Sequence, residues 1–224
     1  MNKTKCSEDC NQFHHKSLHN REINASNSYI DPDQNHNQSC LLMIQRIKIG
    51  ECNGNFANVF WDGGSSISLI TESMAKKIGL SGSSVKLNVT TVRGIEQSIE
   101  SHKYNVVLID KQGKKYKIIV YGIDNITNEI SDIKVEKIIH LFNNINKSEI
   151  ERPSGRIDVL IGMEYAAWHP MKEQSCEHLL IYKNVFGRCL GGYHSSVTEK
   201  TKKKHQYSSY CKSYIISLYY TKFL

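Results

Sequence analysis

The stretch that decides the fold is Asn58-Val59-Phe60-Trp61-Asp62-Gly63-Gly64-Ser65-Ser66-Ile67-Ser68-Leu69-Ile70-Thr71. An apolar strand brings the carboxylate of Asp62 into a turn that contains Gly63 and Gly64. An alternating strand, with Ile67 and Leu69 on one face, then carries the chain away. Because glycine has no Cβ atom, we expect Gly64 to let the backbone pass close to a neighbouring group.

A single aspartate in a glycine turn is typical of half an aspartic protease active site. Such enzymes need two aspartates that share one proton, because two neighbouring carboxylates cannot both ionise, and the pair activates a water for attack on a peptide bond. Asp110, Asp124 and Asp158 lack a glycine turn, so a second copy of the chain must supply the other aspartate. The alternative is an ordinary turn after a strand, since Asp and Gly are common in turns for conformational reasons.

The composition of the chain restricts its class. Its 224 residues suffice for one domain with short appendages. The net charge is +7, but residues 195–224 carry six lysines and one glutamate, which leaves only +2 for residues 1–194. The chain starts without the apolar run of a secretory signal, and no stretch approaches the roughly eighteen apolar residues of a membrane helix. We therefore expect an intracellular protein without membrane contact.

The chain divides into segments of different composition. Residues 21–39 are rich in Asn, Ser, Asp and Gln, which is typical of a polar linker. Residues 40–194 contain the apolar patterns of a folded domain, and residues 195–224 form a basic tail that we expect to be disordered.

Residues 40–194 are predicted to be mainly β with one or two short helices. The predicted strands are 41–49, 56–61, 85–91, 104–110, 116–121 and 157–161, followed by a terminal hairpin of 179–182 and 188–190. Thr71 is predicted to cap a helix over 72–78, which Gly79 ends. The polar stretch 124–153 is predicted to be an insertion or a long loop, with a short helix at 135–142.

Arg93 and Gly94 lie in a short segment between two predicted strands. A hairpin tip at this place would suit a flexible flap over a substrate cleft. A plain surface hairpin fits the same residues equally well.

Three motifs follow one another in the chain. They are Trp61-Asp62-Gly63-Gly64-Ser65, Val159-Leu160-Ile161-Gly162 and Phe186-Gly187-Arg188-Cys189-Leu190-Gly191-Gly192-Tyr193-His194. Over about residues 40–194 they resemble the retropepsin-like aspartic protease of Bel/Pao-type retrotransposon polyproteins. The resemblance implies an all-β acid protease fold, in which one chain forms a closed β-barrel half. It also implies roles for particular residues: Asp62 as the catalytic residue, Gly63, Gly64 and Ser65 as the active-site turn, and Leu160, Ile161 and Gly162 as its support.

The N-terminal segment, residues 1–20, resembles a degenerate form of the zinc knuckle that precedes the protease in the same polyproteins. Zinc binds four Cys or His ligands, and the expected set is Cys6, Cys10, His15 and His19, with His14 as an alternative ligand. Three residues separate the cysteines where the family has two. The other interpretation is a His-rich leader that binds no metal. The sequence therefore predicts at most one structural zinc, and no cofactor for catalysis.

Gly63 departs from the pattern of the family, which has Ser or Thr at this position. The resemblance implies that the Ser or Thr hydroxyl bonds the partner turn across the dimer interface, so a chain with Gly63 can be either an active or an inactive protease. A lost buried hydrogen bond costs about 1 kcal/mol per subunit. Three hypotheses follow. The first is a homodimeric endopeptidase that cleaves polypeptides, such as its own polyprotein, with one Asp62 from each subunit. The second is a dimerising or peptide-binding module without hydrolysis. The third is a nucleic-acid-binding fragment that uses the knuckle and the lysine tail, and it ranks last because such tails are usually only solvated.

Overall fold

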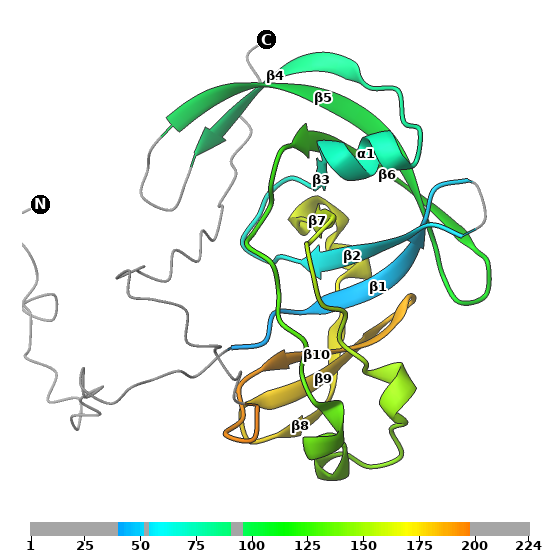
Figure 1. Cartoon of the computed structure of the whole chain (residues 1–224), viewed down its shortest axis with the longest axis vertical. Helices are drawn as coiled ribbons and strands as arrows, with labels where there is room; N and C mark the ends of the chain where they lie inside the picture. Colours follow the sequence, from blue (N-terminus) through cyan, green and yellow to red (C-terminus); the bar gives the residue numbers. More distant parts are fainter. Residues whose placement is uncertain (1–39, 52–53, 91–95, 198–224) are drawn as a thin grey trace, which may run out of the picture. The chain divides into compact units, whose positions relative to one another are not determined.

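The structure of the chain is a computed structural model, which describes residues 40–51, 54–90 and 96–197 (Figure 1). Within these residues the fold is mainly β, with ten strands, one short α-helix and four 3-10 turns. The predicted fold class, mainly β with short helices, is confirmed. The described residues contain no helix with the length and apolar character of a membrane span.

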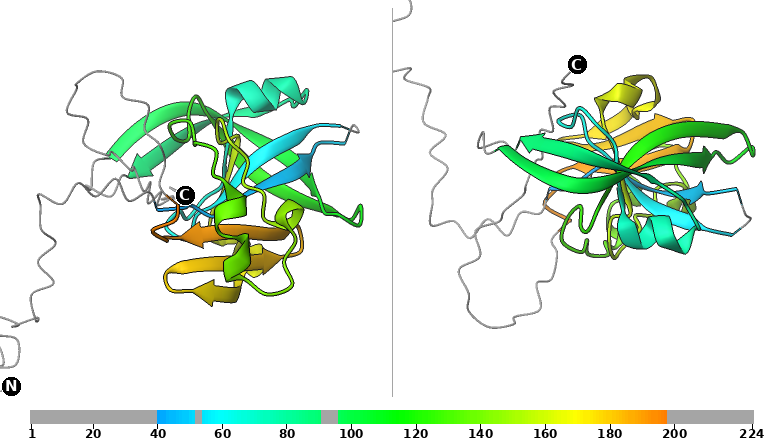
Figure 2. Two further views of the ribbon diagram at one scale, coloured as in Figure 1. Left: turned by 60° about the horizontal axis from the view of Figure 1, so that its bottom comes forward. Right: turned by 90° about the horizontal axis from the view of Figure 1, so that it is seen from above.

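The main sheet has seven strands in the order β1-β2-β7-β3-β6-β5-β4. Their bounds are β1 Ile44–Ile49, β2 Phe56–Trp61, β3 Leu69–Thr71, β4 Ser83–Thr90, β5 Glu96–Ile109, β6 Lys115–Ile123 and β7 Val159–Ile161. Because β1 also pairs with β5, six of these strands close a ring, and β4 extends from β5 outside it (Figures 1 and 2). The ring is compatible with a retropepsin-like fold, but it is not a regular barrel, since β3 and β7 have only three residues each.

Two elements predicted from local sequence patterns are present in the structure, the first hairpin and the helix that follows Thr71. Strands β1 and β2 form the expected antiparallel hairpin, with Ile44 opposite Phe60. Helix α1 (Glu72–Lys77) begins at Thr71, whose Oγ1 accepts a hydrogen bond from the amide of Met74 at 3.3 Å. Buried apolar residues of the ring strands form the main core, and Met74 of α1 packs into the same core.

Strands β4 and β5 form a long antiparallel hairpin that curves away from the ring (Figure 1). Strand β5 begins at Glu96, eight residues earlier than predicted, because pairing with β4 holds a polar segment in the extended conformation. The pair ends at Thr90 opposite Glu96. The predicted flap residues Arg93 and Gly94 lie outside the described residues.

A second sheet contains β8 (Met171–Cys176), β9 (Leu179–Asn184) and β10 (Gly187–Gly192) in the order β10-β9-β8. The hairpin of β9 and β10 is the predicted one. Strand β8 was not predicted, because its residues are mostly polar and exposed and show no alternation. Its pairing with β9 supplies the order that the local sequence lacks.

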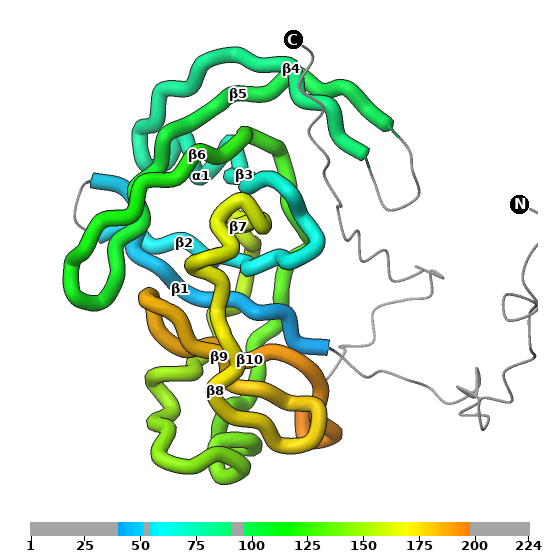
Figure 3. The backbone as a smooth tube through the Cα atoms, turned by 180° about the vertical axis from the view of Figure 1, so that it is seen from behind, coloured from blue at the N-terminus to red at the C-terminus, as the bar shows by residue number. Residues whose placement is uncertain are grey.

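The polar stretch 124–153, before β7, contains short 3-10 turns. Its predicted helix at 135–142 is replaced by the 3-10 turns η2 (Val135–Lys137) and η3 (Ile139–Leu141), and η4 (Lys147–Glu149) follows. Figure 3 shows this segment beside the second sheet. Apolar side chains of this segment and of the second sheet form a second core, together with one residue before β1 and one after β10. The core contains Leu41, Ile133, Val135, Ile138, Phe142, Ile145, Ile150, Leu179, Ile181, Leu190 and Val197. The β-branched residues disfavour a regular helix, and burial of their side chains determines the local path.

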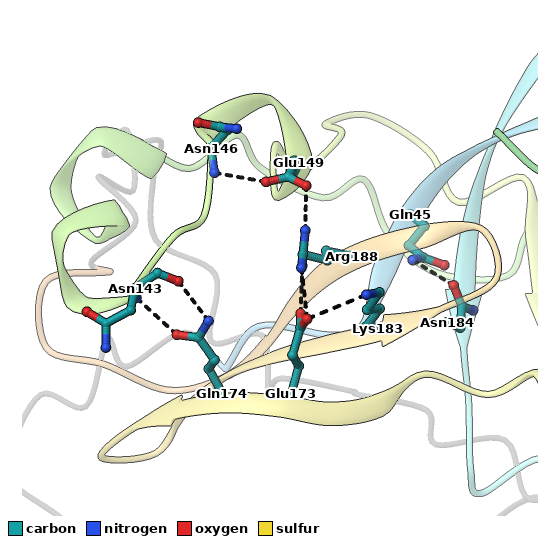
Figure 4. A network of polar contacts seen from close by, with 9 residues as sticks. All are labelled: Gln45, Asn143, Asn146, Glu149, Glu173, Gln174, Lys183, Asn184 and Arg188. Atoms are coloured by element: carbon teal, nitrogen blue, oxygen red, sulfur yellow. Dashed lines mark hydrogen bonds and ion pairs between the residues drawn. The ribbon is translucent and has the colours of Figure 1, made fainter.

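Polar contacts fasten this segment to the second sheet (Figure 4). Arg188 on β10 donates to both carboxylate oxygens of Glu173 on β8, at 2.6 and 2.8 Å, and it also bonds Glu149 of η4. The Gln174 side chain exchanges two hydrogen bonds with the backbone of Asn143, at 3.0 and 2.9 Å. A bidentate pair between partly buried groups is stronger than an exposed one, so these contacts hold the insertion in place.

Candidate active site

Asp62 follows directly after β2 and is 8% exposed. Its amide donates to the carbonyl of Ile161 at 3.0 Å, and its Oδ1 accepts from the amide of Gly64 at 2.8 Å. The amide of Ser65 donates to the Asp62 carbonyl at 3.4 Å. The backbone of the turn therefore orients the carboxylate, in the manner of an Asx-turn. The other oxygen, Oδ2, accepts no hydrogen bond within the described part of the chain.

Strand β7 lies between the two strands that the Asp62 turn connects. It runs parallel to β2, with Ile161 beside Trp61, and antiparallel to β3, with Leu160 beside Leu69. The turn must therefore pass over the end of β7. The structure thus brings Asp62 together with the segment from Leu160 to Gly162, although these residues are about a hundred positions apart in the chain.

At Gly162 the backbone after β7 passes close to the backbone of the Asp62 turn. A Cβ atom there would lie 2.4 Å from the carbonyl oxygen of Ile67 and 2.8 Å from that of Ser65, so no side chain fits. The close approach expected at Gly64 concerns a second subunit and a substrate, and it stays a prediction. At Gly63 a Cβ atom would meet only the Sδ atom of Met163, at 4.0 Å, which leaves room for a small side chain.

Three hydrogen bonds join the Asp62 turn to the residues that follow β7. The amide of Met163 donates to the carbonyl of Ser65 at 2.8 Å, and the amide of Gly162 donates to Ser68 Oγ at 3.0 Å. The amide of Ser68 donates to Oε1 of Glu164 at 2.7 Å. Neither Ser68 nor Glu164 was predicted as part of the site. The available signal was the acidic residue two positions after Gly162, at the end of a buried strand.

The two other serines of the turn behave differently. Ser65 is buried, and its hydroxyl donates to the Ile67 carbonyl at 2.7 Å. The hydroxyl oxygen of Ser66 is buried and has no hydrogen-bond partner within the described residues. The Ser65 hydroxyl is therefore engaged within its own turn and is not available to replace the hydroxyl that Gly63 lacks.

Aromatic residues support the strand that carries Asp62. Trp61 is 1% exposed, and its Nε1 donates to Gln45 Oε1 at 2.7 Å. The ring of His169 packs against the Trp61 ring, with centroids 5.4 Å apart, and His169 Nε2 lies 3.0 Å from the Gly162 carbonyl oxygen. His169 therefore contacts both the strand that precedes Asp62 and the residue that follows β7.

A comparison with known families matches residues 44–174 to the family described as "Putative peptidase (DUF1758)". The match spans more than half of the chain and contains the Asp62 turn, β7 and the hydrogen bonds between them. The chain belongs to this family. The family supports a retropepsin-like peptidase domain. A search of curated proteins found none that matches the chain.

The other aspartates of this peptidase-family domain with carboxylate hydrogen bonds have separate roles. The carboxylate of Asp110 accepts from the amides of Gln112 and Lys114, each at 2.9 Å, and these bonds lower its pKa although burial opposes them. Asp158 accepts from the amide of Asn58 at 2.8 Å, beside the β2 strand, and burial raises its pKa. Neither carboxylate forms a hydrogen bond with the Asp62 turn in the described residues.

Metal ligands form no cluster in the described part of the peptidase-family domain, where no three His, Cys, Asp or Glu residues come together. The predicted zinc ligands Cys6, Cys10, His15 and His19 lie outside the described residues, so zinc binding stays a prediction.

Proposed function

We propose that the chain is an aspartic endopeptidase of the retrotransposon type, active as a homodimer that contributes one Asp62 from each subunit. The observation that carries this proposal is the fixed Asp62 carboxylate, with Oδ1 held by Gly64 and Oδ2 without a partner in the described residues. Such a carboxylate is oriented for chemistry but incomplete, because a water must be activated between two acids. Membership of a peptidase family supports the same conclusion.

The surface of the turn supports an approach of two subunits. Gly63 and Gly64 are exposed, and Met163, next to Gly63, is 46% exposed. Two turns without Cβ atoms can meet closely enough for their aspartates to share a proton. A partly exposed apolar side chain beside them would become buried in the same contact.

In the proposed reaction one Asp62 is ionised and the other is protonated. The ionised carboxylate removes a proton from the water, whose oxygen attacks the carbonyl carbon of a peptide bond. The protonated carboxyl donates its proton to the carbonyl oxygen. The tetrahedral intermediate then collapses and the C–N bond breaks, while the leaving nitrogen receives a proton from the carboxyl that gained one from water. One hydroxyl of the intermediate gives its proton to the other carboxylate as the new carbonyl forms, so that the pair again holds one proton. The polypeptide is the only co-reactant besides water.

A second candidate is a dimerising, peptide-binding module without hydrolysis, and Gly63 favours it. Position 63 offers no hydroxyl to the partner turn, and the Ser65 hydroxyl already donates to Ile67. Contact with nucleic acid through the lysine tail and an intracellular location stay predictions, because they depend on residues outside the described ranges.

Cleavage of a denatured protein at mildly acidic pH, with and without pepstatin, tests the proposal. Wild type should cleave, and Asp62→Asn should lose activity by at least about a hundredfold. Asp124→Asn is the matched control, because Asp124 is exposed and remote from the turn in sequence. Activity that appears only in Gly63→Ser would support the module. Activity that survives Asp62→Asn would contradict the proposed enzyme.

A further inference from the structure

The Ser68 amide lies just beyond the strand pairing of the site. Strand β7 pairs with β3 from Leu69 onward, and therefore it offers no carbonyl to the amide of Ser68. Ser68 is 0% exposed, so water cannot satisfy this donor. Glu164 supplies the missing acceptor, since its Oε1 lies 2.7 Å from the Ser68 nitrogen.

The side chain of Ser68 belongs to the same arrangement. Its Oγ accepts from the amide of Gly162 at 3.0 Å, so Ser68 contacts both Gly162 and Glu164. A buried backbone donor without an acceptor is unfavourable, because it has lost its hydrogen bonds to water. Glu164 therefore completes the hydrogen bonds between the residues that follow β7 and the residues that follow the Asp62 turn.

We propose that Glu164 is a positioning residue for peptide hydrolysis, because its carboxylate holds Ser68 and thereby fixes the Asp62 turn against the end of β7. This inference rests on the function proposed above. Glu164 acts through Ser68 and is not a group that touches substrate. Two reacting carboxylates must stay within about half an ångström of their productive geometry, so a loosened turn lowers the rate of the chemical step.

The acceptor oxygen, rather than the negative charge, performs this role. Burial raises the pKa of the Glu164 carboxyl, while the bonds from Ser68 only partly offset that effect. The charge itself is therefore unfavourable at this place. Glutamine retains the Oε1 acceptor without the charge, and so Glu164→Gln should preserve the position of the turn. Methionine has a similar volume but no oxygen, and Glu164→Met should not.

The test compares Glu164→Gln, Glu164→Met and Glu164→Ala in the full chain, with Glu129→Ala as a control for loss of an exposed acid. We expect kcat to fall at least about tenfold in the Met and Ala variants, with KM within about twofold of wild type. Glu164→Gln and Glu129→Ala should keep both constants. A Gln variant as slow as the Met variant, or an effect on KM alone, would overturn the proposal.

Amide hydrogen exchange separates this inference from the proposed function. The amides of residues 62–68 should exchange at least about tenfold faster in Glu164→Met than in wild type, while β5 and β6 stay protected. This comparison needs no activity, so it decides the positioning role even if wild type cleaves nothing. If the Ala variant unfolds globally, the Met and Gln pair decides. Unchanged exchange in Glu164→Met would overturn the positioning role.

Discussion

Gln45 joins Trp61, the residue before Asp62, to Asn184 on β9. Its Oε1 accepts from Trp61 Nε1 at 2.7 Å. Its Nε2 donates to Asn184 Oδ1 at 3.1 Å, as Figure 4 shows. Asn184 in turn donates to the carbonyl of Trp168 at 2.9 Å. The family match ends at residue 174, but the strand that carries the candidate catalytic residue depends on contacts beyond it.

A chain that ends after residue 176 should therefore fail to fold. It would lose Asn184 and the Phe186 ring, whose centroid lies 5.8 Å from that of Trp61, and would leave the main core open. A chain that ends after residue 197 keeps both cores and is the control. Circular dichroism and thermal melting should show cooperative unfolding only for the longer chain. A cooperative transition in the shorter one would contradict the extended domain.

Gly162→Ala should destabilise the protein by about 2 kcal/mol or more. The new Cβ would lie 2.4 Å from the Ile67 carbonyl oxygen, which is fixed backbone, so β7 and the turn must separate. Gly63→Ala is the matched control, since its Cβ would meet only Met163 at 4.0 Å. Urea denaturation should place the control within about 1 kcal/mol of wild type. Equal stability of the two variants would show that the close approach is absent.

Ser65 and Ser66 differ in their hydrogen bonds, so replacing each with alanine should affect the stability of the protein differently. Ser66→Ala should leave stability unchanged or raise it, because the mutation removes a buried hydroxyl without a partner in the described residues. Ser65→Ala should cost about 1 kcal/mol, because it removes the bond to the Ile67 carbonyl. Chemical denaturation of both variants measures the difference. A large loss in Ser66→Ala would mean that this hydroxyl has a partner, for example in the second subunit.

Stability at alkaline pH should depend on Tyr104. Burial and the 2.6 Å hydrogen bond to Glu72 raise the pKa of this phenol from 10.0 to about 12. A pKa raised by folding contributes stability that is complete below the unfolded pKa and is lost as the pH rises through the folded value. Wild type should therefore lose this contribution between about pH 10 and 12.

The variant Tyr104→Phe should be less stable than wild type by about 1 kcal/mol at neutral pH, and the difference should shrink above pH 10. Tyr182→Phe is the control, because the Tyr182 hydroxyl makes no hydrogen bond in the described ranges. Urea denaturation at several pH values measures both variants. If the stability difference between Tyr104→Phe and wild type stays constant from neutral pH to about pH 12, ionisation of Tyr104 does not control stability.

The sequence was most informative where structure depends on near neighbours. The hairpin of β1 and β2 joins strands that follow each other in the chain, and the cap of α1 by Thr71 joins residues three positions apart. Both were predicted correctly. Strand β8 was missed although it pairs with the next strand along the chain, because its mostly polar residues do not alternate. The irregular turns of the insertion were missed because burial against distant segments determines them. Long-range packing overrides local propensity in such segments.

In the candidate site, too, some residues could be predicted from the sequence and others could not. Asp62 and the segment from Leu160 to Gly162 could be named from motifs, and the structure places them side by side. Glu164 could not be named, because its bond to Ser68 joins residues 96 positions apart. The need for glycine at position 162 likewise depends on a carbonyl of a distant strand connection.

Mixed dimers test the central claim, one Asp62 from each of two subunits, most directly. Wild-type and Asp62→Asn chains are refolded together in varied proportions at constant total concentration, and cleavage is measured. If both carboxylates are required, activity follows the square of the wild-type fraction, so equal amounts give about a quarter of full activity. Activity that falls only in proportion to that fraction, to about one half, would mean that each chain works alone and would contradict the shared site.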